Sequence, residues 1–364
     1  MSIVHIISSL NIGGAENFVV QLANEQTKHK TVKIISLGKT NSNRNYIHAV
    51  NQKVELIELG WKKKYSVIQF YQLMILIKKL MPQVIHVHLH NPFYYVFGMS
   101  IFNRKPRYIH TLHSSFQNWK RVLTIVNKLR FLSSKILHVC LSNAIAKDIK
   151  SQYPRIHTTV IPNGIQSYRH ARSKEDVKSF WKTFETRSEN SFKFLAIGNI
   201  SDNKNYKLLA LTFEAIALKY PNVIGVQIGN PTDQKLSNEL KEIGASNLFL
   251  VGPKENAADF LLETDALIIS SIEEGMPIVA LEALSMGVPI ITTPAGGMVD
   301  VVNENNGIIS RNFEVQEFKK TILKFLDMNF EKRMRLSKNA KVAFENNYEI
   351  SITANLYKVN YGLD

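Results

Sequence analysis

Two glutamates, Glu274 and Glu282, lie on either side of a predicted strand-to-helix turn, where a ligand with phosphate and hydroxyl groups could bind. The run Asp265–Ser271 predicts a short buried strand because it is largely apolar and too short for a typical helix. Gly275 allows a tight turn, and Pro277 suits the first helical position because its missing N–H would be unpaired there anyway. A helix N-terminus favours phosphate, so both carboxylates could reach the hydroxyls of a bound sugar and ribose. The alternative is that both glutamates simply face solvent.

Alternating apolar and helical segments predict an α/β protein with two domains. In the first half, strands are predicted at Ile3–Ile7, Val32–Leu37, Val84–His88, Tyr108–Leu112, Ile136–Leu141 and Thr159–Ile161, and helices at Ala15–Glu25, Val67–Leu80 and Trp119–Leu132. In the second half, strands are predicted at Phe192–Ile197, Val223–Ile228, Leu248–Val251, Ala266–Ile269 and Pro289–Thr292, and a helix at Tyr206–Tyr220. Buried strands separated by helices form parallel sheets. We therefore expect two Rossmann-like domains facing a central cleft, with ligands at the carboxyl ends of the strands.

The expected domains are residues 1–170 and 171–345, joined by a polar stretch near Gln166–Asn190. The helix after Pro277 is predicted to end near Met286, because Gly287 is a suitable C-cap. The segment Glu345–Tyr361 is predicted to form a last amphipathic helix, so that residues 346–364 pack back on the first domain.

The composition is that of an ordinary globular protein of 364 residues. No apolar run reaches the roughly 20 residues of a membrane span, and the N-terminus lacks the basic region and cleavage site of a signal peptide. The single cysteine, Cys140, lies in an apolar run, which excludes a disulfide and favours a buried structural thiol. We therefore expect a cytoplasmic protein.

Positive charge is concentrated in the first half of the chain. Residues 1–170 hold 23 of the 45 Lys and Arg and only 5 of the 30 Asp and Glu, so they carry +18, whereas residues 171–364 carry −3. A basic half indicates an anionic partner: a membrane surface, a phosphate-bearing acceptor or nucleic acid. Since no nucleic-acid-binding motif is present, we expect no nucleic acid.

An ordered set of motifs resembles the retaining glycosyltransferases of family four, which have the GT-B fold. The motifs span nearly the whole chain: Gly13-Gly-Ala-Glu16, Thr111-Leu-His-Ser114, Val160-Ile-Pro-Asn-Gly164, Ala196-Ile-Gly198, Lys204-Asn205, Gly229-Asn230, Glu274–Glu282 and Pro294-Ala-Gly-Gly297. Each motif alone is weak, but the order and spacing together are specific.

The resemblance implies a donor site for a nucleotide-sugar in the second half. Glu282 would bind the ribose hydroxyls, Glu274 the transferred sugar, and Lys204 the diphosphate, whose departure it would assist. The backbone of the turn would hold the diphosphate, although Pro277 contributes no N–H. The turn comprises Gly275, Met276, Pro277, Ile278 and Val279. For Lys204 the alternative is a solvated loop lysine.

Three positions depart from the family's pattern. Asn199 stands where the family usually has an Arg that binds the diphosphate, so that cation is missing or comes from elsewhere. Gln166 and Ser114 stand where the family often has Asp. These two departures concern the linker between the domains and the acceptor side, and they leave the expected reaction class unchanged.

In the first half, the candidate residues are a glycine pair and a histidine. Gly13 and Gly14 follow the first strand and allow the backbone close to a phosphate or a reacting sugar. His113 ends a predicted strand, and the resemblance makes it an active-site residue near the anomeric centre. The alternatives are an ordinary Rossmann turn and a core histidine.

His86, His88 and His90 alternate along one predicted strand and could suggest zinc. With no thiolate nearby and a buried strand, we expect no metal site. No Asp-x-Asp motif ends a strand, which agrees with a metal-independent transferase.

Basic, aromatic-flanked segments predict contact with an anionic membrane. They are the amphipathic helix Asn118–Leu132 and the loops Trp61–Tyr65 and Arg104–Arg107. The alternative is that the helix packs on its own sheet and the loops are solvated.

The sequence therefore predicts a retaining glycosyltransferase without a cofactor, peripheral on the inner face of the cell membrane. The resemblance implies that it moves a sugar, hexosyl or N-acetylhexosaminyl, from a UDP-sugar in surface polysaccharide (capsule or O-antigen) synthesis, and the basic half favours a saccharide linked to lipid diphosphate as the acceptor. The rivals are a nucleotide-sugar epimerase of the same fold and a non-catalytic sugar-nucleotide-binding protein.

Overall fold

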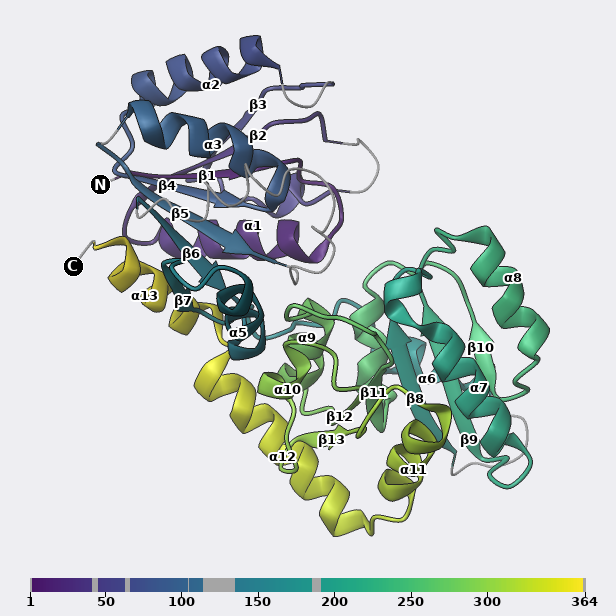
Figure 1. Ribbon diagram of the computed structural model, residues 1–364. Helices are drawn as coiled ribbons and strands as arrows, with labels where there is room; N and C mark the ends of the chain where they lie inside the picture. The colour runs from purple at the N-terminus through teal and green to yellow at the C-terminus, as the bar shows by residue number, and fades with distance from the viewer. Residues whose placement is uncertain are drawn as a thin grey trace. The chain divides into compact units, whose positions relative to one another are not determined.

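The computed structural model describes residues 2–40, 45–62, 66–103, 105–113, 135–184 and 191–362. The chain divides into two compact units, Met1–Gln166 with Asn347–Asp364, and Ser167–Asn346 (Figure 1). Each unit contains a parallel β-sheet with helices packed against it. Among the described residues, no helix is both long and apolar enough to cross a membrane.

Unit 1 contains a sheet in which seven strands of the described residues are all parallel. In order across the sheet they are β3 (Glu55–Glu58), β2 (Thr31–Ser36), β1 (Ser2–Ile7), β4 (Val84–His88), β5 (Arg107–Leu112), β6 (Ile136–Cys140) and β7 (Thr158–Val160). All the carboxyl ends lie along one edge because the strands are parallel. The register places His5 beside His86, and His88 beside Thr111.

Helices cover the sheet of unit 1. They are α1 (Gly14–Gln26), the short η1 (Ile47–Ala49), α2 (Val67–Leu80), α3 (His90–Phe102), α5 (Asn143–Gln152) and α13 (Ile350–Tyr361). Figure 1 shows α2 and α3 on one face of the sheet and α1 and α13 on the other. On the first face, Leu73 and Ile77 of α2 and Phe93 of α3 pack with Val4 and Val87 of the strands. These runs fold as predicted because alternate strand residues point into the layer that each helix covers.

Unit 2 contains a second parallel sheet. Its described strands, in order, are β10 (Leu248–Leu250), β9 (Val223–Ile228), β8 (Phe192–Ile197), β11 (Ala266–Ile269), β12 (Ile290–Thr292) and β13 (Gly307–Ile309). Its helices are α6 (Lys174–Lys182), η3 (Asp202–Lys204), α7 (Tyr206–Ala217), α8 (Gln234–Ile243), η4 (Ala257–Glu263), α9 (Ile278–Ser285), α10 (Met298–Val301), α11 (Val315–Leu326) and α12 (Phe330–Asn347).

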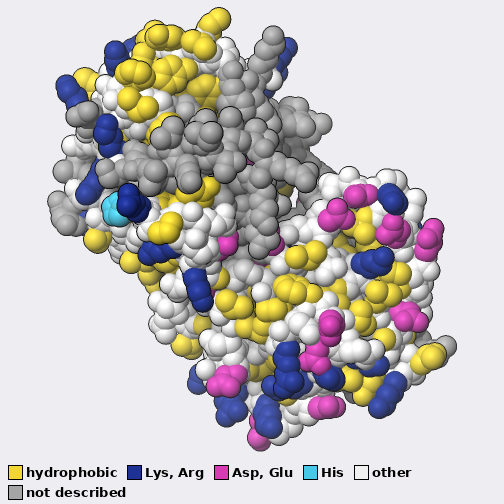
Figure 2. All heavy atoms as spheres, viewed as in Figure 1, with side chains coloured by type: hydrophobic (Ala, Val, Ile, Leu, Met, Phe, Trp, Pro, Cys, Tyr) yellow, Lys and Arg dark blue, Asp and Glu magenta, His cyan; other side chains and the backbone are white. Residues whose placement is uncertain are grey.

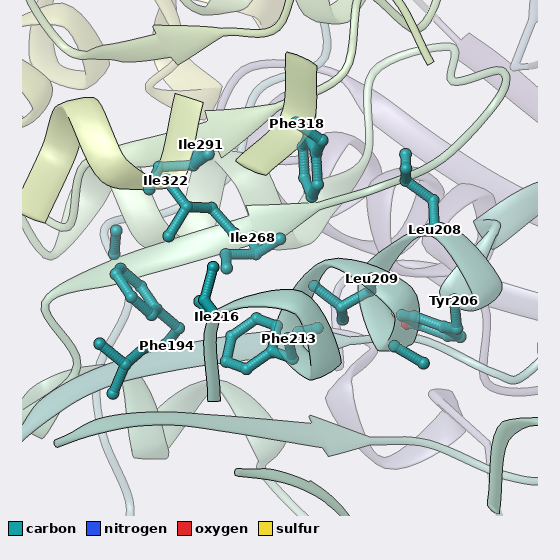
Figure 3. Close-up of a cluster of buried hydrophobic side chains, with 14 of the residues drawn as sticks. Phe194, Tyr206, Leu208, Leu209, Phe213, Ile216, Ile268, Ile291, Phe318 and Ile322 are labelled. Carbon is teal, nitrogen blue, oxygen red and sulfur yellow. The ribbon is translucent and has the colours of Figure 1, made fainter. Parts of the chain in front are cut away.

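The main core of unit 2 lies where α7 and α11 meet the sheet (Figure 3). Phe194 of β8, Phe213 of α7 and Phe318 of α11 are fully buried there. Burying a phenylalanine contributes about 1.5–3 kcal/mol, so this layer holds the carboxyl ends of β8 and β11 at fixed positions. Those two ends carry the residues of the candidate site.

The strands predicted from apolar runs are confirmed to within one or two residues, and α2 has the predicted bounds. Two predictions are wrong. The last helix does not run from Glu345 to Tyr361, because α12 ends at Asn347 and α13 begins at Ile350. His90 is not on the strand of His86 and His88, because β4 ends at His88 and His90 begins α3.

Candidate active site

The turn between β11 and α9 leaves a helix N-terminus open to an anion. The helix begins at Ile278, one residue later than predicted, so Pro277 is its N-cap rather than its first residue, and no side chain caps it. Among the described residues, no acceptor is recorded for the N–H groups of Ile278 and Val279, whereas Ala280 N donates to Pro277 O at 3.0 Å. The helix then ends as predicted, with Met286 as its C-cap and Gly287 in the left-handed conformation.

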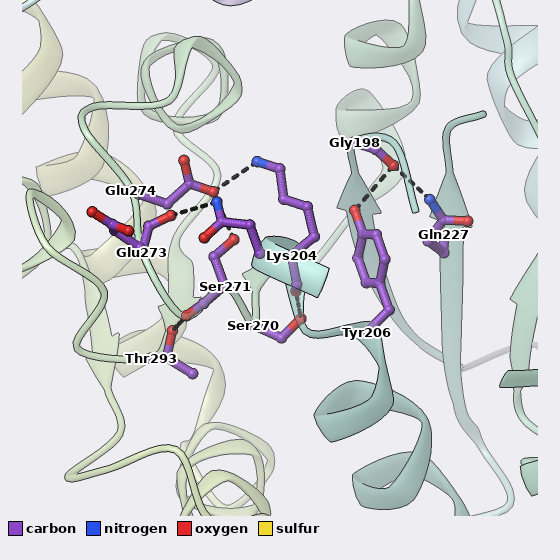
Figure 4. Close-up of polar contacts among 10 residues, drawn as sticks. Gly198, Lys204, Tyr206, Gln227, Ser270, Ser271, Glu273, Glu274 and Thr293 are labelled. Atoms are coloured by element: carbon purple, nitrogen blue, oxygen red, sulfur yellow. Dashed lines mark hydrogen bonds and ion pairs between the residues drawn. The ribbon is translucent and has the colours of Figure 1, made fainter. Parts of the chain in front are cut away.

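Lys204 and Glu274 form an ion pair beside this turn (Figure 4). Lys204 Nζ lies 2.7 Å from Glu274 Oε1, which also accepts a hydrogen bond from Ser271 Oγ at 2.6 Å. Ser270 Oγ donates to the Lys204 carbonyl at 2.8 Å, so the end of β11 holds η3 in place. The sequence predicted both residues for the donor site but gave no sign that they pair with each other.

The Lys204–Glu274 pair lines a small pocket. Residues from β8, α7, β11 and α9 close it, namely Ile197, Tyr206, Ile268, Ile269, Pro277 and Val279. The pocket therefore brings the ion pair and the start of α9 together.

A glycine turn after β12 fixes the backbone of Glu274. Gly297 N donates to the Glu274 carbonyl at 2.8 Å, and Gly296 has a φ of +49°. A side chain at Gly296 would collide with the Glu274 carbonyl. The Pro294–Gly297 motif thus positions one of the predicted catalytic residues.

Replacing Gly296 by alanine is expected to lower donor affinity or turnover about tenfold, because the new methyl group must displace Glu274. Gly244→Ala is the matched control: Gly244, with a φ of +69°, caps α8 and has only one atom, at 3.8 Å, near an added Cβ. Both changes carry the backbone cost of about 1–2 kcal/mol. Kinetics and thermal melts of the two variants separate displacement from strain; equal activity in both would contradict the positioning role.

Asn199 ties together the loops that follow β8 and β9. Its Oδ1 accepts hydrogen bonds from Asn230 N at 3.2 Å and Asn230 Nδ2 at 3.3 Å. The preceding Gly198 carbonyl accepts from Gln227 Nε2 at 2.7 Å and Tyr206 Oη at 3.1 Å. Asn199 is exposed at this edge of the sheet, and Lys204 remains the cation recorded beside Glu274.

Glu282 lies on α9 near a second carboxylate that sequence reasoning missed. Burial, and then the charge of Asp259, raise the pKa of Glu282 from its ordinary 4.5 to about 7. Asp259 is fully buried in η4 and accepts hydrogen bonds from Tyr168 Oη, Ala171 N and Arg172 N, each at 3.1 Å. These donors satisfy Asp259, whereas among the described residues no hydrogen-bond partner is recorded for the Glu282 carboxylate.

In unit 1, Gly13, Gly14 and His113 lie at one edge of the sheet. Gly13 is the N-cap of α1 and its carbonyl accepts from Asn17 N at 3.0 Å. His113 directly follows β5, and its ring centroid lies 5.6 Å from that of Phe18 on α1. The structure therefore brings the glycine pair and the histidine to the same edge of the sheet.

A histidine cluster lies behind His113. Burial lowers the pKa of His113 to about 3 and that of His5 to about 4, and the pKa values of His86 and His88 are lowered as well. The ring atoms of His5, His86 and His88 are close enough to share a metal ion. Each of their ring nitrogens nevertheless has a protein partner within 2.6–3.2 Å, which describes a hydrogen-bond network.

Several predicted features lie outside the described residues. They are Ser114, the helix Asn118–Leu132, Lys63, Lys64, Tyr65 and Arg104. The membrane predictions that depend on them therefore stay predictions.

The two units define the GT-B class of glycosyltransferase folds. The structure is similar to that of Anabaena HepE in complex with UDP and glucose, with a TM-score of 0.82, 17% identity and coverage of 100% of both chains. It is also similar to sucrose-phosphate synthase from Thermosynechococcus elongatus, with a TM-score of 0.80, 15% identity and coverage of 100% of both chains.

Two family models cover most of the chain between them. "Glycosyltransferase Family 4" matches residues 12–169 and "Glycosyl transferases group 1" matches residues 177–343. The chain belongs to the family-four glycosyltransferases.

Curated relatives match over part of their length. A galactosyltransferase of Escherichia coli, named for UDP-Gal and α-D-GlcNAc-diphosphoundecaprenol, is 28% identical over 67% of this chain and 66% of its own. An uncharacterized glycosyltransferase of Methanocaldococcus jannaschii is 32% identical over 31% of this chain and 28% of its own. This chain thus spans between about a quarter and two thirds of these relatives.

Proposed function

We propose that this protein transfers a hexosyl or N-acetylhexosaminyl group from a UDP-sugar, with retention, to a saccharide linked to lipid diphosphate. The observation that carries the proposal is the uncapped start of α9 beside the Lys204–Glu274 pair. The E. coli relative is named for a UDP-sugar donor and a lipid-diphosphate acceptor, and structural neighbours were solved with UDP and with UDP-glucose. A Bacillus subtilis relative is named a putative teichuronic acid biosynthesis glycosyltransferase, and the structural neighbour WaaG is described as involved in lipopolysaccharide biosynthesis. These names support surface polysaccharide synthesis as the setting.

The proposed donor site assigns one ligand group to each element of unit 2. The N–H groups of Ile278 and Val279 and the Nζ of Lys204 bind the diphosphate, because a helix N-terminus and a lysine both stabilise anions. Glu282 binds the ribose hydroxyls. Glu274 binds the hydroxyls of the transferred sugar, and Gly275, Met276 and Pro277 shape the turn.

Charge stabilisation and positioning carry the proposed reaction. Glu274 Oε1 already accepts hydrogen bonds from Lys204 Nζ and Ser271 Oγ. Its charge is therefore partly neutralised, and it is poorly suited to attack an anomeric carbon. We assign it to orienting the sugar instead. Lys204 and the start of α9 supply the positive charge for the departing diphosphate, which makes the proposed reaction independent of metal.

A thermal-shift screen across nucleotide-sugars tests the donor assignment. Ligand binding stabilises a protein in proportion to the logarithm of ligand concentration over Kd. We expect a UDP-sugar to raise the Tm most, and Glu282→Gln and Lys204→Ala to lose most of that rise. Equal shifts in the wild type and both variants would contradict the site.

The proposed peripheral attachment has a specific surface, the outer face of α2. There Val67, Ile68 and Ile75 are 73%, 70% and 65% exposed, although Leu73 and Ile77 on the inner face are buried. Figure 2 shows hydrophobic side chains gathered over this helix, with Lys and Arg beside them. Exposed apolar residues on a basic domain are typical of helices that lie on anionic membranes. We propose that α2 contacts the inner face of the cell membrane.

The double variant Ile68→Glu/Ile75→Glu is expected to lower binding to vesicles containing anionic lipid at least tenfold, because it removes apolar contact and adds negative charge. Phe330→Glu is the control, because Phe330 is 69% exposed on α12 of the other unit. Co-sedimentation with the vesicles at low and high salt measures the binding of both variants and of the wild type. Undiminished binding of the double variant would contradict α2 as the contact surface.

A further inference from the structure

A chain of buried hydrogen bonds joins Gln26, at the end of α1, to His113. Gln26 Oε1 lies 2.8 Å from His5 Nε2. His5 Nδ1 lies 3.0 Å from His88 Nε2, and His88 Nδ1 lies 3.2 Å from His113 Nε2. His5 and His88 are fully buried, whereas His113 is partly exposed. The chain therefore starts in the interior of unit 1 and ends at the edge where the predicted site residues lie.

The amide of Gln26 determines which ring nitrogens carry protons. Its oxygen only accepts, and a neutral imidazole has one donor and one acceptor nitrogen. His5 therefore donates from Nε2 and accepts at Nδ1, which requires His88 to donate from Nε2. His88 then accepts at Nδ1 from His113 Nε2. The lowered pKa values of these rings agree with neutral imidazoles, and His113 Nδ1 is left unprotonated.

A second branch is consistent with this orientation of the Gln26 amide. Gln26 Nε2 donates to the Tyr361 hydroxyl at 3.3 Å, and Tyr361 therefore donates to His86 Nδ1 at 2.6 Å. His86 Nε2 then donates to Thr111 Oγ1 at 2.7 Å. Both branches are satisfied at once, and turning the amide over would reverse every proton in both. Because buried donors without partners are costly, the orientation of the amide and the proton order of both branches are fixed together.

We propose that Gln26 is a positioning residue for His113: through His5 and His88 it keeps the proton of His113 on Nε2 and presents Nδ1 as an acceptor for a substrate hydroxyl. Among the described residues, no partner is recorded for His113 Nδ1. The inference deepens the proposed function and rests on it, because the hydroxyl would belong to a transferase substrate. Gln26 itself touches no substrate.

The proton order can be read directly from the wild-type protein without ligand. Two-bond proton–nitrogen NMR correlations of protein labelled with ¹⁵N-histidine distinguish the two neutral tautomers, and His→Gln variants assign the signals. We expect His5, His86, His88 and His113 all to be protonated on Nε2. A proton on Nδ1 of any of the four would overturn the proposal.

The variant Gln26→Met tests the control that the amide exerts. Without the amide oxygen, a proton on His5 Nε2 would be a buried donor without an acceptor, so the chain should reverse and His113 should become protonated on Nδ1. A substrate hydroxyl could then no longer donate to His113 Nδ1 and would have to accept from it, and losing the donated hydrogen bond should lower kcat about tenfold, with the Kd for nucleotide unchanged. Leu22→Met, one turn earlier on α1 and also buried, is the matched control and should change neither.

The tautomer and the rate together decide the outcome. An unchanged tautomer in Gln26→Met, or a reversed tautomer with an unchanged rate, would overturn the proposal. Failure of the proposed function is distinguishable, because a protein with no transfer activity would still show the proton order in its spectra. If Gln26→Met does not fold, the wild-type spectra alone confirm or overturn the proton order.

Discussion

Replacing Lys204 by alanine is expected to lower the transfer rate by about 10²–10³-fold. The amine is the cation that the structure places beside Glu274 at the open start of α9, and removing a group that stabilises developing charge typically costs this much. Lys204 is partly exposed, so loss of its ion pair should change the free energy of unfolding by only about 1 kcal/mol. Single-turnover transfer kinetics and thermal melts measure the two effects.

Lys207→Ala is the matched control, because Lys207 is exposed on the adjacent helix α7. It removes the same charge nearby and should leave transfer unchanged. Because Asn199 replaces the Arg that the family usually has, little other positive charge would compensate at this position. A Lys204→Ala enzyme with wild-type turnover would place the diphosphate elsewhere.

Replacing Glu282 by glutamine is expected to stabilise the ligand-free protein and to weaken nucleotide-sugar binding at least tenfold. The pKa of Glu282 is raised to about 7, so its ionisation opposes folding at higher pH. Since 1 pKa unit corresponds to about 1.4 kcal/mol, Glu282→Gln should gain about 1–3 kcal/mol at pH 8. The lost binding follows because the amide presents one acceptor oxygen and no charge to the ribose hydroxyls.

The sign of the pH dependence follows from the raised pKa. Stability that protonated Glu282 preserves is fully present below pH 4.5 and is lost as the pH rises through about 7. The gain from Glu282→Gln should therefore be larger at pH 8 than at pH 5. Wild-type affinity for a nucleotide-sugar should rise between pH 6 and pH 8 as the carboxylate forms. Calorimetric titrations that show no such rise, or the same rise in Glu282→Gln, would contradict the role of Glu282.

Local patterns were sufficient to predict the donor turn and all the described strands except Glu55–Glu58 and Gly307–Ile309. Strands such as Val84–His88 and Val223–Ile228 are continuous apolar or buried runs. The turn at residues 275–277 is recognisable because glycine allows a tight turn and proline suits a helix start. The strand Glu55–Glu58 was missed because its ends are charged and exposed. This strand is stabilised by its pairing with β2, and its own sequence gives little indication of a strand.

The missed features depend on contacts between residues far apart in the chain. The last helix is broken at Tyr348 and Glu349 because Ile165 N donates to the Tyr348 carbonyl and Ile350 N donates back to Ile165 O, each at 2.9–3.0 Å. Asp259 accepts hydrogen bonds from a segment 87–91 residues away, and its charge raises the pKa of Glu282 on another helix. His5 joins the histidine network across 83 residues. Periodicity cannot predict such pairs.

The most direct test of the proposed reaction is transfer from a UDP-sugar, labelled in the sugar, to a saccharide linked to lipid diphosphate, followed by NMR of the product's anomeric configuration. We expect a new glycosidic bond with the anomeric configuration of the donor. Glu274→Ala and Lys204→Ala should not form this product. An inverted product would contradict retention. If no nucleotide-sugar gave transfer, or if the donor sugar were only epimerised, the assignment as a sugar transferase with this acceptor would be wrong.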